Sequence, residues 1–148
     1  MKIKYGLYQN GELLIVKYSE YLATDSLIII DNYINEINCN NSVKYIISDF
    51  RDISDSVNIN SIKLEENQKL FKSQPEVKIK YVHLVNTPVA TALSTLYLDN
   101  LSSSEVNLLV CSTLEKIINF LQLQIKSAEL EMLIQTLESV LKFESSFQ

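Results

Sequence analysis

Several residue types that commonly carry enzyme chemistry are scarce in this sequence of 148 residues. It has no tryptophan, two glycines, two prolines, two cysteines and one histidine. No glycine-rich phosphate-binding loop is present, nor any cysteine and histidine spacing typical of a metal site. A catalytic triad would depend on His83 alone, whose parity within residues 77–85 predicts a packed strand face and a hydrogen-bonded structural role. We therefore expect a protein that is not an enzyme and needs no metal or cofactor.

Charge and apolar patterning disfavour several classes of partner. The formal net charge is −5, which argues against binding to nucleic acid or to anionic membranes, because both need clustered basic residues. No apolar run approaches the roughly 20 residues that span a bilayer, and the first residues lack the apolar core of a signal peptide. Cys39 and Cys111 show no motif spacing and are interpreted as free thiols, with Cys111 packed in the core. These features predict a cytoplasmic protein without membrane insertion.

Apolar periodicity predicts one α/β domain. Residues 2–9 and 12–19 form an antiparallel hairpin around Asn10-Gly11, a dipeptide that tolerates positive φ in tight turns. Later strands are expected over residues 43–50, 77–85 and 105–111. Helices alternate with them and are expected to start at Thr24 or Asp25, at Asn58 or Asn60, at Thr87-Pro88, and at Ser112. This order predicts a mostly parallel, five-stranded sheet opened by an antiparallel hairpin, with a helix after each later strand.

A last amphipathic helix is expected beyond this α/β domain of residues 1–125. Its apolar positions are spaced like a coiled-coil seam, at Leu130, Ile134, Leu137 and Leu141. The helix would cover residues 126–143 and pack on its own domain or on a partner in a homodimer, and residues 144–148 would fray. A shift of the apolar phase near Ser127 predicts a break before it, and one long bent helix is the alternative.

Polar residues follow the apolar run of residues 43–50, at the point where a central parallel strand would end. Ligands of α/β domains bind at the carboxyl ends of such strands, so any site is expected here. The candidate residues are Asp49, Arg51, Asp52, Ser54, Asp55 and Ser56. A magnesium site is one interpretation of the clustered aspartates. The favoured one is that Arg51 pairs with one of these acids while the others cap backbone N–H groups.

The chain resembles the STAS-like fold family, which includes the bacterial anti-sigma-factor antagonists, and more narrowly its small stand-alone bacterial members. The resemblance covers roughly residues 1–123. It is carried by the segments YGLYQNGELLIVKYS, IISDFRDISD, TPVATALSTLYLD and VNLLVCSTLEKIINFL. It implies reversible binding of a partner kinase, switched by phosphorylation of a serine in an aspartate-serine-serine-glycine-like turn. Ser56 is the nearest counterpart here and Ser54 the second, but the glycine is missing.

We therefore expect a non-catalytic module that binds a protein partner through residues 49–56. An alternative from another class is a binder of a small apolar or lipid-like ligand held between helices and sheet. Its pocket would be lined by residues such as Ala90 and Tyr97 on the helix that follows Thr87. The serine phosphoswitch is a third, weaker alternative.

Overall fold

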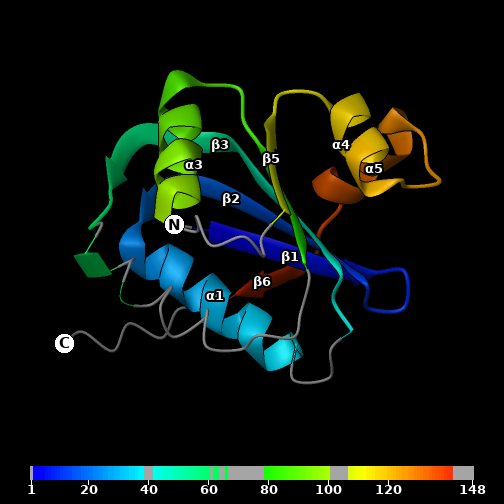
Figure 1. Cartoon of the computed structure of the whole chain (residues 1–148), viewed down its shortest axis with the longest axis horizontal. Coiled ribbons are helices and arrows are strands. Elements are labelled where there is room, and N and C mark those ends of the chain that lie inside the picture. Colours follow the sequence, from blue (N-terminus) through cyan, green and yellow to red (C-terminus); the bar gives the residue numbers. More distant parts are fainter. Residues whose placement is uncertain are drawn as a thin grey trace.

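A mixed sheet of six strands forms the centre of the molecule in a computed structural model that describes residues 2–38, 42–60, 62–63, 66, 79–100 and 107–141 (Figure 1). The strand order is β5-β4-β3-β2-β1-β6. The strands are β1 (Lys2–Tyr8), β2 (Leu13–Ala23), β3 (Tyr45–Asn58), β4 (Lys80–Leu84), β5 (Asn107–Cys111) and β6 (Ser139–Leu141). The main helices are α1 (Thr24–Asn38), α3 (Pro88–Asn100), α4 (Leu114–Leu121) and α5 (Ser127–Gln135).

Local sequence accounts for the start of the fold. β1 and β2 pair antiparallel, and the turn between them has positive φ at Gln9, Asn10 and Gly11. β2, β3, β4 and β5 run parallel to one another. Ile46 and Ile47 are fully buried in β3, which lies between two parallel strands. The predicted hairpin, parallel sheet and interior strand are thus confirmed.

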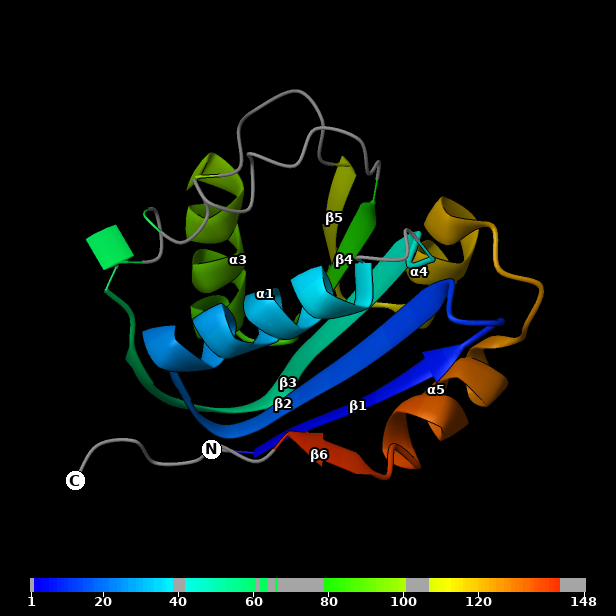
Figure 2. The same cartoon turned by 90° about the horizontal axis from the view of Figure 1, so that it is seen from below.

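Helices cover both faces of the sheet and give the protein two cores. Figure 2 shows α1 and α3 on one side of the sheet and α5 on the other. Alternate residues of the strands supply the two cores because successive side chains point to opposite faces. Leu14, Val16 and Ile46 pack in the core beneath α1 and α3, whereas Leu13, Ile15 and Ile47 pack in the core beneath α4 and α5. Cys111 is buried in the second core as a free thiol, and burial raises its pKa.

The main difference from the expected fold is the length of β3. The sequence predicted a strand over residues 43–50 and then a polar turn, but β3 continues through Asp52, Ile53 and Ser54 to Asn58. It remains paired with β2 over this distance, across two register irregularities. β2 pairs with residues 52–53 and 57–58 of this extension, and Ile53 is buried in the core, so tertiary pairing overrides the turn tendency of serine and aspartate.

The second difference lies in the C-terminal segment. The helix expected over residues 126–143 ends at Gln135, where the Thr136 hydroxyl donates to the carbonyl oxygen of Met132 at 2.7 Å. The chain then forms β6, which pairs antiparallel with the outer edge of β1, so the sheet has six strands rather than five. The open edge of β1 offers backbone partners that a helix could not use. The predicted break is confirmed, because α4 ends at Leu121 and α5 begins at Ser127.

Some expectations fall outside the described residues. They include most of the helix predicted up to Lys72, the first residues of the strand predicted at 77–85, and the tail 144–148. Cys39 also lies there. None of the described helices is both long enough and apolar enough to cross a membrane.

Candidate functional site

The first two candidate residues of β3 form an ion pair inside the molecule. The Asp49 side chain is only 1 % exposed. Arg51 Nε donates to Asp49 Oδ1 at 3.0 Å and Arg51 Nη2 donates to Asp49 Oδ2 at 2.9 Å. The backbone N–H of Arg51 also donates to Asp49 Oδ1. The expectation that Arg51 pairs with a neighbouring acid therefore holds, and the guanidinium fork binds the carboxylate through both of its oxygens.

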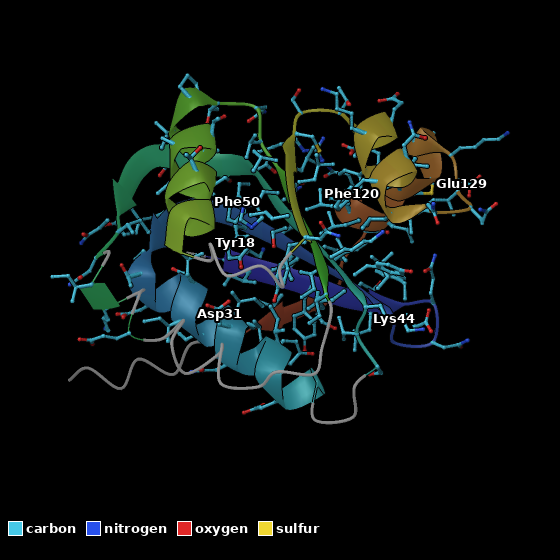
Figure 3. The ribbon with its side chains drawn as sticks, in the orientation of Figure 1. Tyr18, Asp31, Lys44, Phe50, Phe120 and Glu129 are labelled. Carbon is cyan, nitrogen blue, oxygen red and sulfur yellow. The ribbon has the colours of Figure 1, made fainter. Side chains whose placement is uncertain are left out.

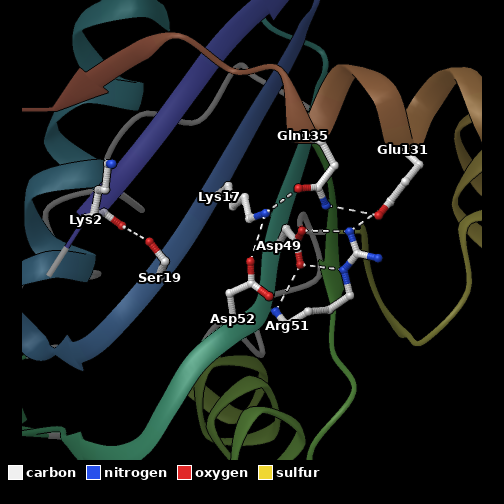
Figure 4. A network of polar contacts seen from close by, with 8 residues as sticks. All are labelled: Lys2, Lys17, Ser19, Asp49, Arg51, Asp52, Glu131 and Gln135. Carbon is white, nitrogen blue, oxygen red and sulfur yellow. Dashed lines mark hydrogen bonds and ion pairs between the residues drawn. The ribbon is translucent and has the colours of Figure 1, made fainter.

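This pair belongs to a larger network that joins the sheet to α5 (Figure 4). Arg51 Nη2 also donates to Glu131 Oε2 at 2.9 Å, and Glu131 accepts a hydrogen bond from the Gln135 side chain. Lys17 on β2 donates to Gln135 Oε1 at 3.0 Å and lies 2.9 Å from a carboxylate oxygen of Asp52. The network thus connects β2, β3 and the C-terminal helix through side chains far apart in the sequence.

The electrostatics of the network favour its charged form. Hydrogen bonds from Arg51 lower the pKa of the Glu131 carboxyl, and the hydrogen bond to Asp49 raises the pKa of the Arg51 guanidinium. Two of the clustered aspartates are already paired with cations, Asp49 with Arg51 and Asp52 with Lys17. Among the described residues, no group of three or more histidine, cysteine, aspartate or glutamate side chains could hold a metal ion.

Beyond this network, β2 and β3 extend past their other neighbours as a two-stranded segment, which we call the distal ribbon. It consists of residues 20–23 of β2 and residues 52–58 of β3. β1 pairs with β2 only as far as Ser19, and β4 pairs with β3 only as far as Asp49. Glu20 has a positive φ of 70° at one of the two irregularities, a backbone conformation that L residues with a side chain rarely adopt.

The distal ribbon carries the exposed candidates. The side chain of Asp52 is 55 % exposed, and Ser54 is also exposed. Asp55 and Ser56 lie on the backbone of the ribbon, but their side chains are outside the described part of the structure. Ser56 therefore stands within a strand and not at the opening of a helix, which differs from the turn that the sequence predicted.

Two large apolar side chains at this end of the molecule were not singled out in the sequence. Tyr21 is 40 % exposed on β2, and Ile62 is 68 % exposed just after β3. The segment after β3 is held near the end of β2, because the Asn60 backbone donates to the Thr24 hydroxyl and Lys63 pairs with Asp25. No local pattern marks these residues, since their exposure depends on where the neighbouring strands stop.

A separate cavity lies between the helices and the sheet, on the side of α1 and α3. Its volume is about 30 Å³. From α3 it is lined by Leu93 and Ser94, whereas Ala90 is buried in the same core without lining it and the side chain of Tyr97 is outside the described residues. Pockets for drug-sized ligands have volumes of about 300–1,000 Å³, so the cavity in this structure is much smaller than a pocket for a lipid-like molecule.

His83 reaches this cavity and has the structural role that its strand position predicted. It is 4 % exposed, its Nδ1 lies 3.0 Å from the Ser94 hydroxyl oxygen, and its ring packs edge-on against Phe50. Burial lowers the pKa of His83 to about 4, so the imidazole is neutral near pH 7.

Comparison with known proteins identifies the fold. No protein-family model matches the sequence, and no curated protein matches it. Among solved structures, the chain is similar to the anti-sigma factor antagonist SpoIIAA in its unphosphorylated form. The two share 14 % sequence identity and a TM-score of 0.53, and the match covers 81 % of this chain and 97 % of SpoIIAA. The mixed sheet with an opening hairpin and helices on both faces is therefore the STAS-like fold of the anti-sigma-factor antagonists.

Proposed function

We propose that this chain is a non-catalytic, cytoplasmic module that regulates a protein partner by binding it. The observation that carries the proposal is the likeness of the fold to SpoIIAA over nearly all of that protein, whose described role is that of an anti-sigma factor antagonist. Fold alone does not specify function, so the proposal also needs a surface suited to binding.

The distal ribbon, with the adjoining Ile62, is the surface that we propose for the partner. Tyrosine is enriched among the residues that dominate protein interfaces, and exposed apolar side chains gain most when a partner removes them from water. Tyr21 and Ile62 are such residues, and the ribbon also carries the exposed carboxylate of Asp52, which pairs with Lys17. Asp49 and Arg51 do not belong to this surface, because their side chains hold α5 to the sheet.

The proposal is tested by affinity capture from a lysate of the host organism, with quantitative mass spectrometry of the retained proteins. Full-length wild-type protein is compared with the double variant Tyr21→Ser and Ile62→Ser. Met132→Ser is the matched control, because Met132 is 67 % exposed on α5, away from the ribbon. A partner retained by the wild type and by the control, but lost by the ribbon variant, supports the proposal. Equal retention by all three proteins contradicts the proposed surface.

We further propose that phosphorylation switches this surface, since the similar SpoIIAA structure is that of an unphosphorylated form. A phosphate on Ser54 or Ser56 would add about 1.5 to 2 negative charges at pH 7 to the distal ribbon, next to Asp52 and Asp55. Ser54→Asp and Ser56→Asp should then change the amount of captured partner, with Ser54→Asn and Ser56→Asn as uncharged controls. If aspartate and asparagine variants capture equal amounts, the switch is excluded and partner binding itself is unaffected.

The expectation of a homodimer through the last helix rested on an apolar stripe that would be free to pack on a second copy. Leu130, Ile134 and Leu137 are nearly fully buried against the chain's own sheet. The apolar stripe that could have packed on a second copy is therefore used within the chain.

A further inference from the structure

The cavity between the helices and the sheet has both apolar and polar side chains in its wall. Much of its wall is apolar, but side chains capable of hydrogen bonding come from both the sheet and the helices. These side chains are Tyr18 on β2, Asp31 on α1, Ser48 on β3, Tyr81 and His83 on β4, and Ser94 on α3. Tyr18 on β2 and Phe50 on β3 line the cavity, and Figure 3 shows both near α3 in projection, with Asp31 on α1. Every one of the six polar residues is at most 6 % exposed.

Most of these groups already have a hydrogen-bond partner. His83 contacts Ser94, and the Tyr18 hydroxyl hydrogen-bonds to Ser48. Tyr81 differs from them. Its hydroxyl oxygen is buried and has no hydrogen-bond partner among the described residues. Leaving such a hydroxyl unsatisfied costs free energy comparable to a hydrogen bond, which is why buried polar groups in native proteins almost always have a partner.

The size of the cavity fits one or two water molecules. A water molecule needs a cavity of roughly 10–15 Å³ on this scale and two to four polar partners. The cavity of about 30 Å³ meets the first condition, and the cluster around Tyr81 meets the second. A benzene-sized molecule needs roughly 150 Å³ and is excluded.

We propose that this cavity is a binding site for ordered water, in which one or two water molecules accept a hydrogen bond from the Tyr81 hydroxyl and bridge it to polar groups on the helices. The water would join β4 to α1 and α3 at the centre of the first core. The polar residues of this site all lie outside the distal ribbon, which contributes only Leu22 to the apolar wall.

A high-resolution crystal structure of the full chain tests the proposal directly. Electron density for a water within hydrogen-bond distance of Tyr81 Oη and of a second polar atom in the wall is the expected result. A well-ordered cavity wall without such density would overturn the proposal. A direct hydrogen bond from Tyr81 Oη to a protein group would overturn it as well.

Urea unfolding of Tyr81→Phe provides a second measurement that does not depend on crystals. If water satisfies the hydroxyl, its removal leaves the water with one partner fewer, and the folding equilibrium constant falls about fivefold. If the hydroxyl is unsatisfied, its removal leaves the constant unchanged or raises it, which is evidence against the bound water. Tyr18→Phe is the matched control, because it deletes a direct hydrogen bond to Ser48 in the same core and must lower the constant in either case.

Discussion

Lowering the pH from 7 to 5 should destabilise this protein through one residue, His83. The chain has a single histidine, and burial lowers its pKa from 6.5 to about 4 in the folded state. In the unfolded chain the imidazole regains its ordinary pKa of about 6.5 and binds a proton at pH 5, whereas the folded protein does not. The unfolded state therefore takes up more protons, so stability falls as the pH drops below about 6.5 and levels off below about 4.

The size of the effect follows from the two pKa values. The difference between a pKa of 6.5 in the unfolded chain and about 4 in the folded protein corresponds to roughly 3 kcal/mol of unfolding free energy over the full pH range, and to about 2 kcal/mol between pH 7 and pH 5. Glu131 acts in the same direction, because its folded pKa is lowered, but its contribution is lost only as the pH falls below its ordinary value of 4.5. The interval from pH 7 to pH 5 therefore reports mainly on the histidine.

Urea unfolding at pH 7 and pH 5 measures this loss. His83→Gln keeps a side chain that can hydrogen-bond to Ser94 but cannot titrate, so the loss should shrink to a small fraction of that in the wild type. Asp31→Asn is the control for the acid that lines the same cavity, and it should leave the loss in place. Tyr18 and Tyr81 also face the site, but burial raises both of their pKa values, so they stay neutral. If His83→Gln shows the same loss as the wild type, the assignment is refuted.

Three further predictions concern stability at pH 7, each measured by urea unfolding. Arg51→Ala leaves the buried carboxylate of Asp49 unpaired and should lower the free energy of unfolding by about 3 kcal/mol. Adding Asp49→Ala should restore part of that free energy. A loss no larger than that of a surface substitution would contradict the buried ion pair. Glu20→Gly removes the strain of the positive φ and should raise the free energy of unfolding by up to about 1 kcal/mol. A lower free energy of unfolding would contradict the left-handed conformation of this residue. Leu130→Ala should lower the free energy of unfolding by about 2–5 kcal/mol, because Leu130 is fully buried against the sheet. Met132→Ala should lower it only slightly, because Met132 is exposed. Equal losses in the two variants would contradict the packing of α5.

Patterns confined to a short stretch of sequence predicted their elements well. Asn10-Gly11 marks the hairpin because few residues tolerate positive φ, and the turn adopts it. Thr87-Pro88 predicts a helix start, and the Thr87 hydroxyl accepts the Ala90 backbone N–H at 3.1 Å. The parity of His83 predicts a buried face, since side chains alternate along a strand. Each of these features depends on residues within a few positions of one another.

The polar network shows why the candidate site could be predicted only in part. That Arg51 pairs with a nearby acid follows from their adjacency, and the pair with Asp49 spans two residues. Its second partner, Glu131, is 80 residues away and sits on α5. No spacing in the sequence brings these two residues together, because their contact exists only once α5 has packed on the sheet.

The α/β class, the opening hairpin, the interior strand and the buried faces could be predicted from the chain alone, because hydrophobic period and turn chemistry are local properties. The continuation of β3 through its serines and aspartates and the strand at residues 139–141 depend instead on long-range pairing. In both places a weak local preference is overruled by the open edge of a neighbouring strand, whose backbone groups need hydrogen-bond partners.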